Sequence, residues 1–147
     1  MSHPPFYRGS MAVANMWGIA LMLFLIAHAL VGVLMFAGRP QQAASSWPSS
    51  KSWLFGTMGL TEDSQRKLAM VLMAIAALLF IGGALGVVGV PAIVDMWPWL
   101  VVAGAVVSAL TLTLYFSPWW LGGIAINAAL VVSILVFNWP TNEALGI

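Results

Sequence analysis

The chain has 147 residues, of which 62% are hydrophobic and only 6% are charged, and its formal net charge is +1. Soluble globular domains carry about 25% charged residues, so this composition excludes a soluble domain with an ordinary wetted surface. The small net charge also argues against a nucleic-acid partner, because neutralising phosphates requires clustered Lys and Arg. The absence of cysteine excludes disulfides, thiolate metal sites and iron–sulfur clusters.

Four apolar runs follow one another along the chain, at residues 17–36, 68–90, 99–116 and 119–137. Each run is about 20 residues long, which is the length that a helix needs to cross the roughly 30 Å hydrocarbon layer of a bilayer. None carries the polar stripe of a core helix in a soluble protein, and every charged residue lies outside the runs. The sequence therefore predicts an all-α fold, an integral membrane four-helix bundle in which residues 1–147 form one transmembrane domain.

The first run is expected to stay in the mature protein as a membrane span. It is longer than the apolar region of a cleavable signal peptide, and its N-terminal flank carries only Arg8. The tryptophans support the same boundaries, because indole rings concentrate where the membrane meets water. The run ends on one side of the membrane carry Trp17, Trp97, Trp99 and Trp139. At or beyond the run ends on the other side lie Trp47, Trp53, Trp119 and Trp120.

The loop at residues 39–67 determines the expected orientation. It carries every Lys and Arg of the chain except Arg8, namely Arg39, Lys51, Arg66 and Lys67. Cytoplasmic loops are rich in Lys and Arg, so we expect this loop in the cytoplasm, both termini outside, and the protein in a cell inner membrane. Within the loop, residues 51–55 form a short amphipathic piece expected to lie on the membrane surface. Thr61 is a good N-cap for the second span.

Small residues lie within the second, third and fourth runs, where they allow helix backbones to approach closely. Gly82 and Gly86 are four residues apart, and Gly104 and Gly123 lie in the next two runs. The Ser117-Pro118 turn makes those two runs an antiparallel hairpin. Two interpretations of the glycines are open, namely packing within the bundle and docking of another subunit.

His28 is the only side chain within the four runs that can titrate near neutral pH, which makes it a candidate functional residue. His28, Ser108 and Asn127 each lie about eight residues, or about 12 Å, from the end of their run on the side of the 39–67 loop. We therefore expect a polar layer at one depth, with Ser108 and Asn127 meeting across the hairpin. The layer is either a network that fixes helix register or a cofactor site, with His28 as a single axial ligand of a tetrapyrrole or as a hydrogen-bond partner of a quinone.

Other site chemistry has little support in the sequence. A haem with two histidine ligands is not expected, because the second histidine, His3, lies in the polar N-terminal segment. A zinc or iron site would require three or four ligands, and the runs do not supply them. The runs contain no carboxylate for acid–base work, and no Ser–His–acid set, glycine-rich phosphate loop or HExxH motif is present. We therefore expect no enzyme.

The chain resembles a widespread set of small bacterial four-span membrane proteins that have no assigned function. The resemblance rests on His28-Ala29-Leu30-Val31, on Gly59-Leu60 before the second run, and on Gly122 with Ile126-Asn127 in the fourth. The first helix in that set often carries two histidines four apart, but here the second position is Gly32. The resemblance implies the architecture, and a similarity in outline to DoxX-like four-helix proteins implies that a quinone-linked role is open.

Taken together, these features favour a non-catalytic accessory subunit of a larger energy-transducing membrane complex, respiratory or photosynthetic. The expected partners are membrane lipids and other transmembrane subunits, and bound lipid is an expected ligand. The alternative is a small stand-alone transporter or a quinone-handling protein, for which His28 is the residue of interest.

Overall fold

The computed structural model describes residues 6–37 and 51–147, with side chains from residue 16 onward in the first segment. Every regular element in these two segments is helical, which confirms the predicted all-α fold. The α-helices are α1 (Phe6–Ala37), α2 (Trp53–Thr57), α3 (Glu62–Val87), α4 (Trp97–Leu114), α5 (Leu121–Leu135) and α6 (Asn142–Leu145). Two short 3-10 helices, η1 (Val94–Met96) and η2 (Pro118–Trp120), lead into α4 and α5.

Four of the helical segments are long and apolar enough to cross a membrane, as the apolar runs predicted. They are Met16–Ala37, Glu62–Val87, Val94–Leu114 and Pro118–Leu135. Helix α3 begins at Glu62, before the apolar run that starts at Leu68, because charged residues form its first turns. The Thr61 side chain caps this helix by accepting a 3.3 Å hydrogen bond from Ser64 N, and Lys67 pairs with Asp63 at 2.6 Å. An apolar run ends at such charged residues, whereas the helix continues through them to its N-cap.

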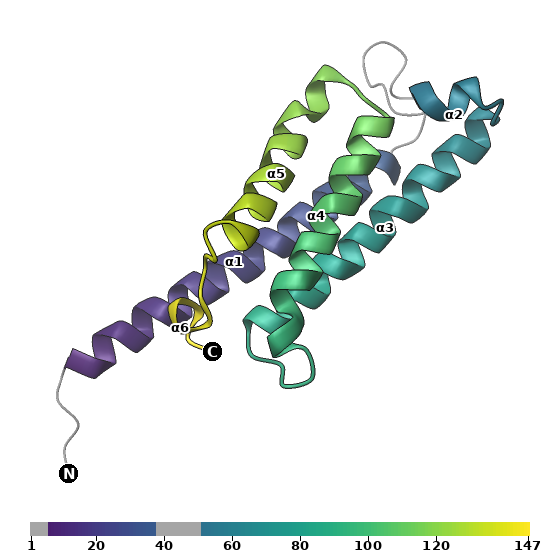
Figure 1. The fold of residues 1–147 in the computed structure, drawn as a ribbon. Helices are drawn as coiled ribbons and strands as arrows, with labels where there is room; N and C mark the ends of the chain where they lie inside the picture. The colour runs from purple at the N-terminus through teal and green to yellow at the C-terminus, as the bar shows by residue number, and fades with distance from the viewer. Residues whose placement is uncertain (1–5, 38–50) are drawn as a thin grey trace.

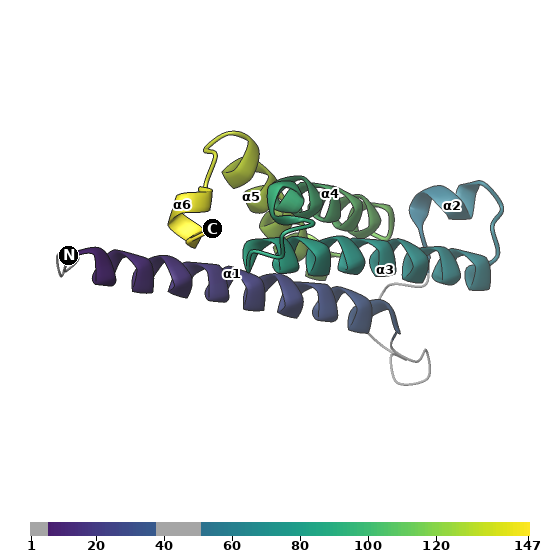
Figure 2. The same cartoon turned by 90° about the horizontal axis from the view of Figure 1, so that it is seen from below.

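The spanning helices pack in the order α1, α3, α4, α5, each lying along the next (Figure 1). In the view from below, α1 lies along one edge of the bundle, and α6 lies beside it near one end (Figure 2). Helices α1 and α5 have far fewer contacts with each other than with their neighbours. The arrangement therefore leaves a seam between α1 and α5.

The glycines of α3 bring its backbone against α4. A Cβ atom at Gly86 would lie 2.6 Å from Trp97 Cβ, and one at Gly83 would lie 2.5 Å from a Val101 methyl group. A Cβ at Gly82 would lie 3.3 Å from Leu100 Cδ1. Atoms of α4 fill these positions, which favours packing within the bundle as the role of Gly82 and Gly86 over docking of another subunit.

The other two glycines predicted for packing also face neighbouring helices. A Cβ at Gly104 would lie 3.2 Å from Phe80 Cδ1, and one at Gly123 would lie 2.9 Å from Leu112 Cδ1. Gly122 is different, because a Cβ there would meet no atom within 4 Å. Spacing alone did not distinguish Gly122 from Gly123, since adjacent residues of a helix point about 100° apart.

A polar cluster closes the α2 end of the bundle. Gln65 is buried; its side chain accepts a 2.7 Å hydrogen bond from Ser52 N and donates one of 2.7 Å to Leu60 O. The Tyr115 hydroxyl donates to Gln65 O, and the indole of Trp53 donates to Thr113 O at 3.0 Å. The short helix α2 covers residues 53–57 where the sequence predicted an amphipathic piece over residues 51–55. These bonds attach it to α3 and α4.

The C-terminal segment closes the opposite end. The indole of Trp97 donates a 3.0 Å hydrogen bond to Asn142 Oδ1, and Leu145 is buried in the core. The absence of a side chain at Gly18 allows close approach, because a Cβ there would lie 3.0 Å from Leu145 O. Helix α6 therefore packs onto α1, and the C-terminus folds back over the bundle (Figure 1).

Two of the tryptophans at the helix ends are buried in the protein. Trp97 and Trp120 are each only 2% exposed, and their indole N–H groups bond to Asn142 Oδ1 and Tyr115 O. They are enclosed by protein because these acceptors lie inside the fold. The exposed tryptophans are Trp17, Trp53, Trp99, Trp119 and Trp139. The predicted position of Trp47 lies outside the described residues.

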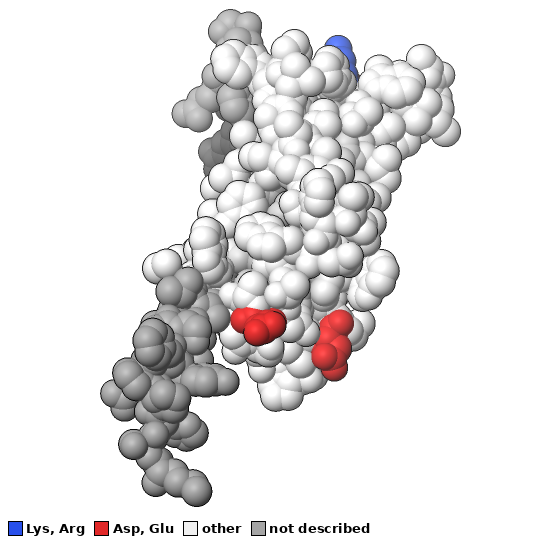
Figure 3. All heavy atoms as spheres, turned by 60° about the vertical axis from the view of Figure 1, so that its left-hand side comes forward, with Lys and Arg blue, Asp and Glu red and all other residues white. Residues whose placement is uncertain are grey.

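Charges segregate to the two ends of the described bundle. Lys51, Arg66 and Lys67 lie at the α2 end with Glu62 and Asp63, whereas Asp95 and Glu143 lie at the end formed by η1 and α6. The hydrogen bond and ion pair with Glu62 raise the pKa of Lys51. Figure 3 shows acidic side chains in red at the end of the molecule opposite the basic ones in blue. Arg39 lies outside the described residues.

Candidate functional site

The three polar residues predicted to form a layer are joined by hydrogen bonds. His28 Nε2 lies 3.0 Å from Asn127 Oδ1, and Asn127 Nδ2 donates to Ser108 Oγ at 2.9 Å. Asn127 is 0% exposed and Ser108 is 3% exposed, whereas His28 is half-buried. The predicted contact across the α4–α5 hairpin is confirmed, and the layer extends from α1 through α5 to α4.

Asn127 is positioned by the composition of its own helix. It is the only buried residue of α5, and the remaining side chains of this helix are apolar or small. An amide directed into lipid would lack hydrogen-bond partners, which costs roughly 1–3 kcal/mol. Rotating α5 so that Asn127 faces α1 and α4 removes this cost. The amide therefore determines which face of α5 points inward.

Aromatic rings flank the imidazole of His28. Phe24, one turn earlier on α1, stacks on it at a centroid distance of 5.8 Å and an interplanar angle of 13°. Phe80 of α3 meets it edge-on at 5.1 Å and 81°. With the bond to Asn127, these contacts fix the ring plane and direct Nε2 toward α5.

A cavity of about 280 Å³ opens beside this layer, and we call it the His28 cavity. Its walls come from α1, α3, α4 and the start of α5. Apart from the indole groups of Trp119 and Trp120, the polar side chains in its lining are His28 and Ser108. The apolar walls include Met35, Met73, Phe80, Leu112 and Ile126. The cavity therefore offers hydrogen-bonding groups at one place and hydrocarbon elsewhere.

Gly32 and Gly122 also line the His28 cavity. A Cβ at Gly32 would lie 2.8 Å from the terminal methyl carbon of Met73. Gly32 lies four residues after His28, at the position where the four-span proteins that the sequence is expected to resemble often carry a second histidine. Here the flexible end of Met73 approaches that position instead, so this wall of the cavity is apolar.

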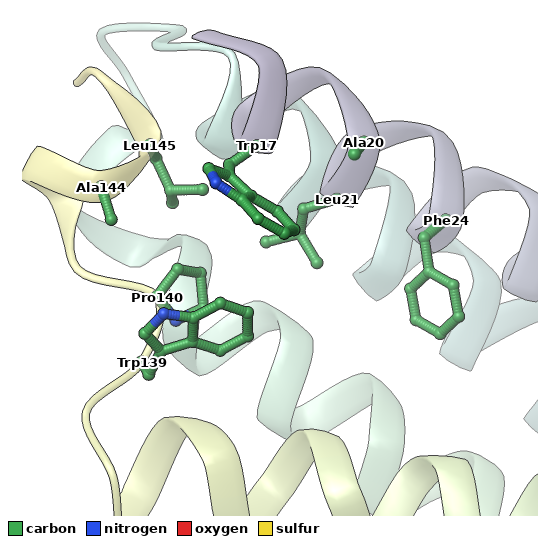
Figure 4. Close-up of a pocket in the computed structure, with 8 residues that line it drawn as sticks. All are labelled: Trp17, Ala20, Leu21, Phe24, Trp139, Pro140, Ala144 and Leu145. Carbon is green, nitrogen blue, oxygen red and sulfur yellow. The ribbon is translucent and has the colours of Figure 1, made fainter. Parts of the chain in front are cut away.

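A second cavity, of about 370 Å³, lies between α1 and the C-terminal segment, and we call it the Trp17 cavity. Figure 4 shows Trp17, Leu21 and Phe24 on one side and Trp139, Pro140 and Leu145 on the other. The rings of Trp17 and Trp139 meet edge-to-face at a centroid distance of 6.3 Å. The sequence did not predict this cavity, because it depends on a C-terminal segment that folds back onto α1.

The two cavities lie on either side of the hydrogen bond between His28 and Asn127. The Trp17 cavity is lined on α1 by residues 17–24, and the His28 cavity by residues 28–35. The bond therefore closes the seam between α1 and α5 at its middle and leaves an open space at each side.

Residues 6–37 and 51–147 contain no group of three or more His, Cys, Asp or Glu that could hold a metal. One buried hydroxyl, Ser117 Oγ at the α4–α5 turn, has no hydrogen-bond partner within the described part of the chain. It lies outside the lining of both cavities.

Comparisons with protein-family models, with curated proteins and with solved structures find no match to this chain.

Proposed function

We propose that this protein is a non-catalytic membrane protein that binds a neutral amphiphile, of the quinone type, in the His28 cavity. The observation that carries the proposal is the cavity itself. It is apolar, lies in the seam between two spanning helices, and has His28 and Ser108 in its wall. A molecule dissolved in the bilayer would reach it from the side, without passing through water.

The chemistry of the wall selects the ligand class. Among the described residues, no Lys, Arg, Asp or Glu lines the His28 cavity, so a charged headgroup would be buried there without a counter-charge from them. A volume of about 280 Å³ is close to the lower end of the range for ligand sites, roughly 300–1,000 Å³. These limits favour a single ring with one or two polar oxygen atoms. A lipid acyl chain fits the Trp17 cavity better, because the indoles of Trp17 and Trp139 are the only polar side-chain groups among its described lining residues.

A hydrogen-bonded ligand is better supported than a tetrapyrrole. His28 Nε2 is already bonded to Asn127, and the imidazole is held between Phe24 and Phe80. Axial ligation of a tetrapyrrole through Nε2 would break that bond and leave the buried Asn127 oxygen without a partner. A quinone-type molecule can occupy the cavity while the polar layer stays intact.

The test is to identify what co-purifies with the protein. The wild-type chain is isolated from its native membrane in mild detergent, and its bound neutral lipids are extracted and measured by mass spectrometry. Gly122→Phe should empty the cavity, because Gly122 lines it and has open space around its Cβ position. Gly56→Phe is the matched control, since Gly56 of α2 also has no atom within 4 Å of that position and lies outside the cavity.

We expect a carbonyl-bearing amphiphile in near-stoichiometric amount with the wild-type protein and with Gly56→Phe, and its loss from Gly122→Phe. If all three proteins carry the same bulk phospholipids and nothing else, the proposal is wrong.

The second candidate is an accessory subunit of a larger membrane complex. The observation that favours it is unequal burial of the spans. In the most apolar 18-residue windows, 39% of residues are buried in the α3 and α4 spans, against 17% in α1 and 11% in α5. Partner helices could cover the outer faces of α1 and α5. Native mass spectrometry of the mild-detergent preparation tests this, and a stable monomer without other polypeptides would argue against it.

A further inference from the structure

The polar layer has a direction, which the two hydrogen bonds define. Asn127 Nδ2 faces Ser108, so the amide oxygen faces His28. An amide oxygen can only accept, so His28 must donate through Nε2–H. The amide nitrogen in turn donates to Ser108 Oγ. Every donor in the layer therefore points from α1 toward α4.

The layer ends at a hydroxyl hydrogen. Ser108 Oγ accepts from Asn127, and within the described residues its own hydrogen has no acceptor. The neighbouring hydroxyls of α4 behave differently, because Thr111 and Thr113 each donate to the carbonyl one turn earlier, at 2.8 Å in both cases. Ser108 is 3% exposed and lines the His28 cavity. A buried hydroxyl without an acceptor is unfavourable, so an occupant of the cavity can stabilise it.

We infer that the occupant of the His28 cavity accepts a hydrogen bond from Ser108, and that the site therefore selects an oxidised, carbonyl-bearing molecule over its hydroxyl-bearing reduced form. This inference rests on the proposed function and names the substrate class of the same site. A carbonyl oxygen satisfies the Ser108 hydrogen. A hydroquinone oxygen can also accept from Ser108, but its hydroxyl brings a hydrogen that needs a second acceptor, and Asn127, whose oxygen accepts from His28, does not line the cavity.

The test measures equilibrium binding of three labelled probes to the full chain in lipid nanodiscs, with empty nanodiscs subtracted. The probes are a short-chain alkyl benzoquinone, its hydroquinone, and an alkylbenzene of the same chain length. We expect the benzoquinone to bind roughly tenfold more tightly than the hydroquinone, the ratio that one buried unsatisfied donor produces. Ser108→Ala should weaken benzoquinone binding by a similar factor, and Ser108→Thr should restore it.

Thr111→Val is the matched control. Thr111 is a fully buried hydroxyl on the same helix, but it donates to its own backbone and lies outside the cavity. Its replacement should leave benzoquinone affinity unchanged. Equal binding of both redox forms, or a Ser108→Ala affinity equal to that of the wild type, would overturn the inference. If none of the three probes binds saturably, the proposed function itself fails.

A second measurement does not depend on any variant of the layer. In a His3→Gln chain, His28 is the only histidine, and its ¹⁵N chemical shifts report which ring nitrogen carries the proton. The direction of the layer requires protonated Nε2 and unprotonated Nδ1. The opposite tautomer would reverse the layer, make Ser108 the donor to Asn127, and overturn the inference even if quinones bind.

Discussion

The hydrogen bond from His28 to Asn127, 3.0 Å long, joins two helices that otherwise have few contacts with each other. Because α1 and α5 are adjacent to α3 and α4 respectively, the bond also closes the bundle into a ring of four helices. The first prediction tests this role.

Asn127→Leu should destabilise the bundle by about 1–3 kcal/mol, because it leaves His28 Nε2 and Ser108 Oγ without their partner. The measurement is equilibrium unfolding of the full chain in bicelles. Ser133→Ala is the control, since Ser133 is a half-buried polar residue of the same helix outside the layer. Equal stability of the two variants would show that the layer does not hold α1 to α5.

Gly86→Leu should destabilise the contact between α3 and α4 by about 1–3 kcal/mol, the usual cost of overpacking. The cause is direct, because even a Cβ at this position would lie 2.6 Å from Trp97 Cβ. Thermal unfolding in detergent measures the effect. Gly122→Leu is the comparison and should be neutral in stability, because open space surrounds that position. A Gly86→Leu protein of wild-type stability would contradict the packing described for α3.

The orientation predicted from the charges places the α2 end in the cytoplasm and the α6 end outside. The chain has no cysteine, so single-cysteine variants give unambiguous labelling. Met58→Cys lies at the α2 end and Glu143→Cys at the α6 end, and both positions are exposed. An impermeant thiol reagent applied to intact cells should label only Glu143→Cys. Labelling of Met58→Cys alone would reverse the orientation.

Asn142→Ala should release the C-terminal segment. The Trp97 indole is buried, and removing its acceptor leaves an unsatisfied N–H that costs about 1–3 kcal/mol. Hydrogen exchange of residues 141–147 should accelerate, because α6 is too short to persist without its contacts. Glu143→Ala, an exposed neighbour on α6, should leave that exchange unchanged. Slow exchange in Asn142→Ala would mean that Leu145 alone holds the segment.

The number and type of the spans could be predicted from the sequence because both depend on local properties. Apolar length alone identifies a spanning helix, and the Thr61 cap is a local hydrogen bond. The polar layer was also predictable, since residues at equal depth on adjacent spans can meet. The sequence could not indicate which side of α3 its glycines face. That depends on where α4 packs, because the four-residue spacing of Gly82 and Gly86 allows close approach by any neighbouring helix and does not say which one.

Features that depend on distant contacts were not predictable. Trp97 matches the pattern of an interfacial tryptophan, and its burial depends on Asn142, which lies 45 residues later. The Trp17 cavity depends on the same C-terminal segment. No periodicity links these residues, because α6 contributes one buried side chain, Leu145.

The unequal burial of the spans has a mechanical consequence. Helices α3 and α4 touch along their glycines at van der Waals distance, so this pair should be stiff, and its amides should exchange most slowly with solvent deuterium. Helix α1 packs along α3 as extensively as α4 does and also contacts α6, whereas α5 packs less extensively, on α4. A small lateral displacement therefore costs least at α5, which the His28–Asn127 bond holds to α1. Lateral pressure in the surrounding bilayer would change the width of the seam before it disturbed any other part of the fold.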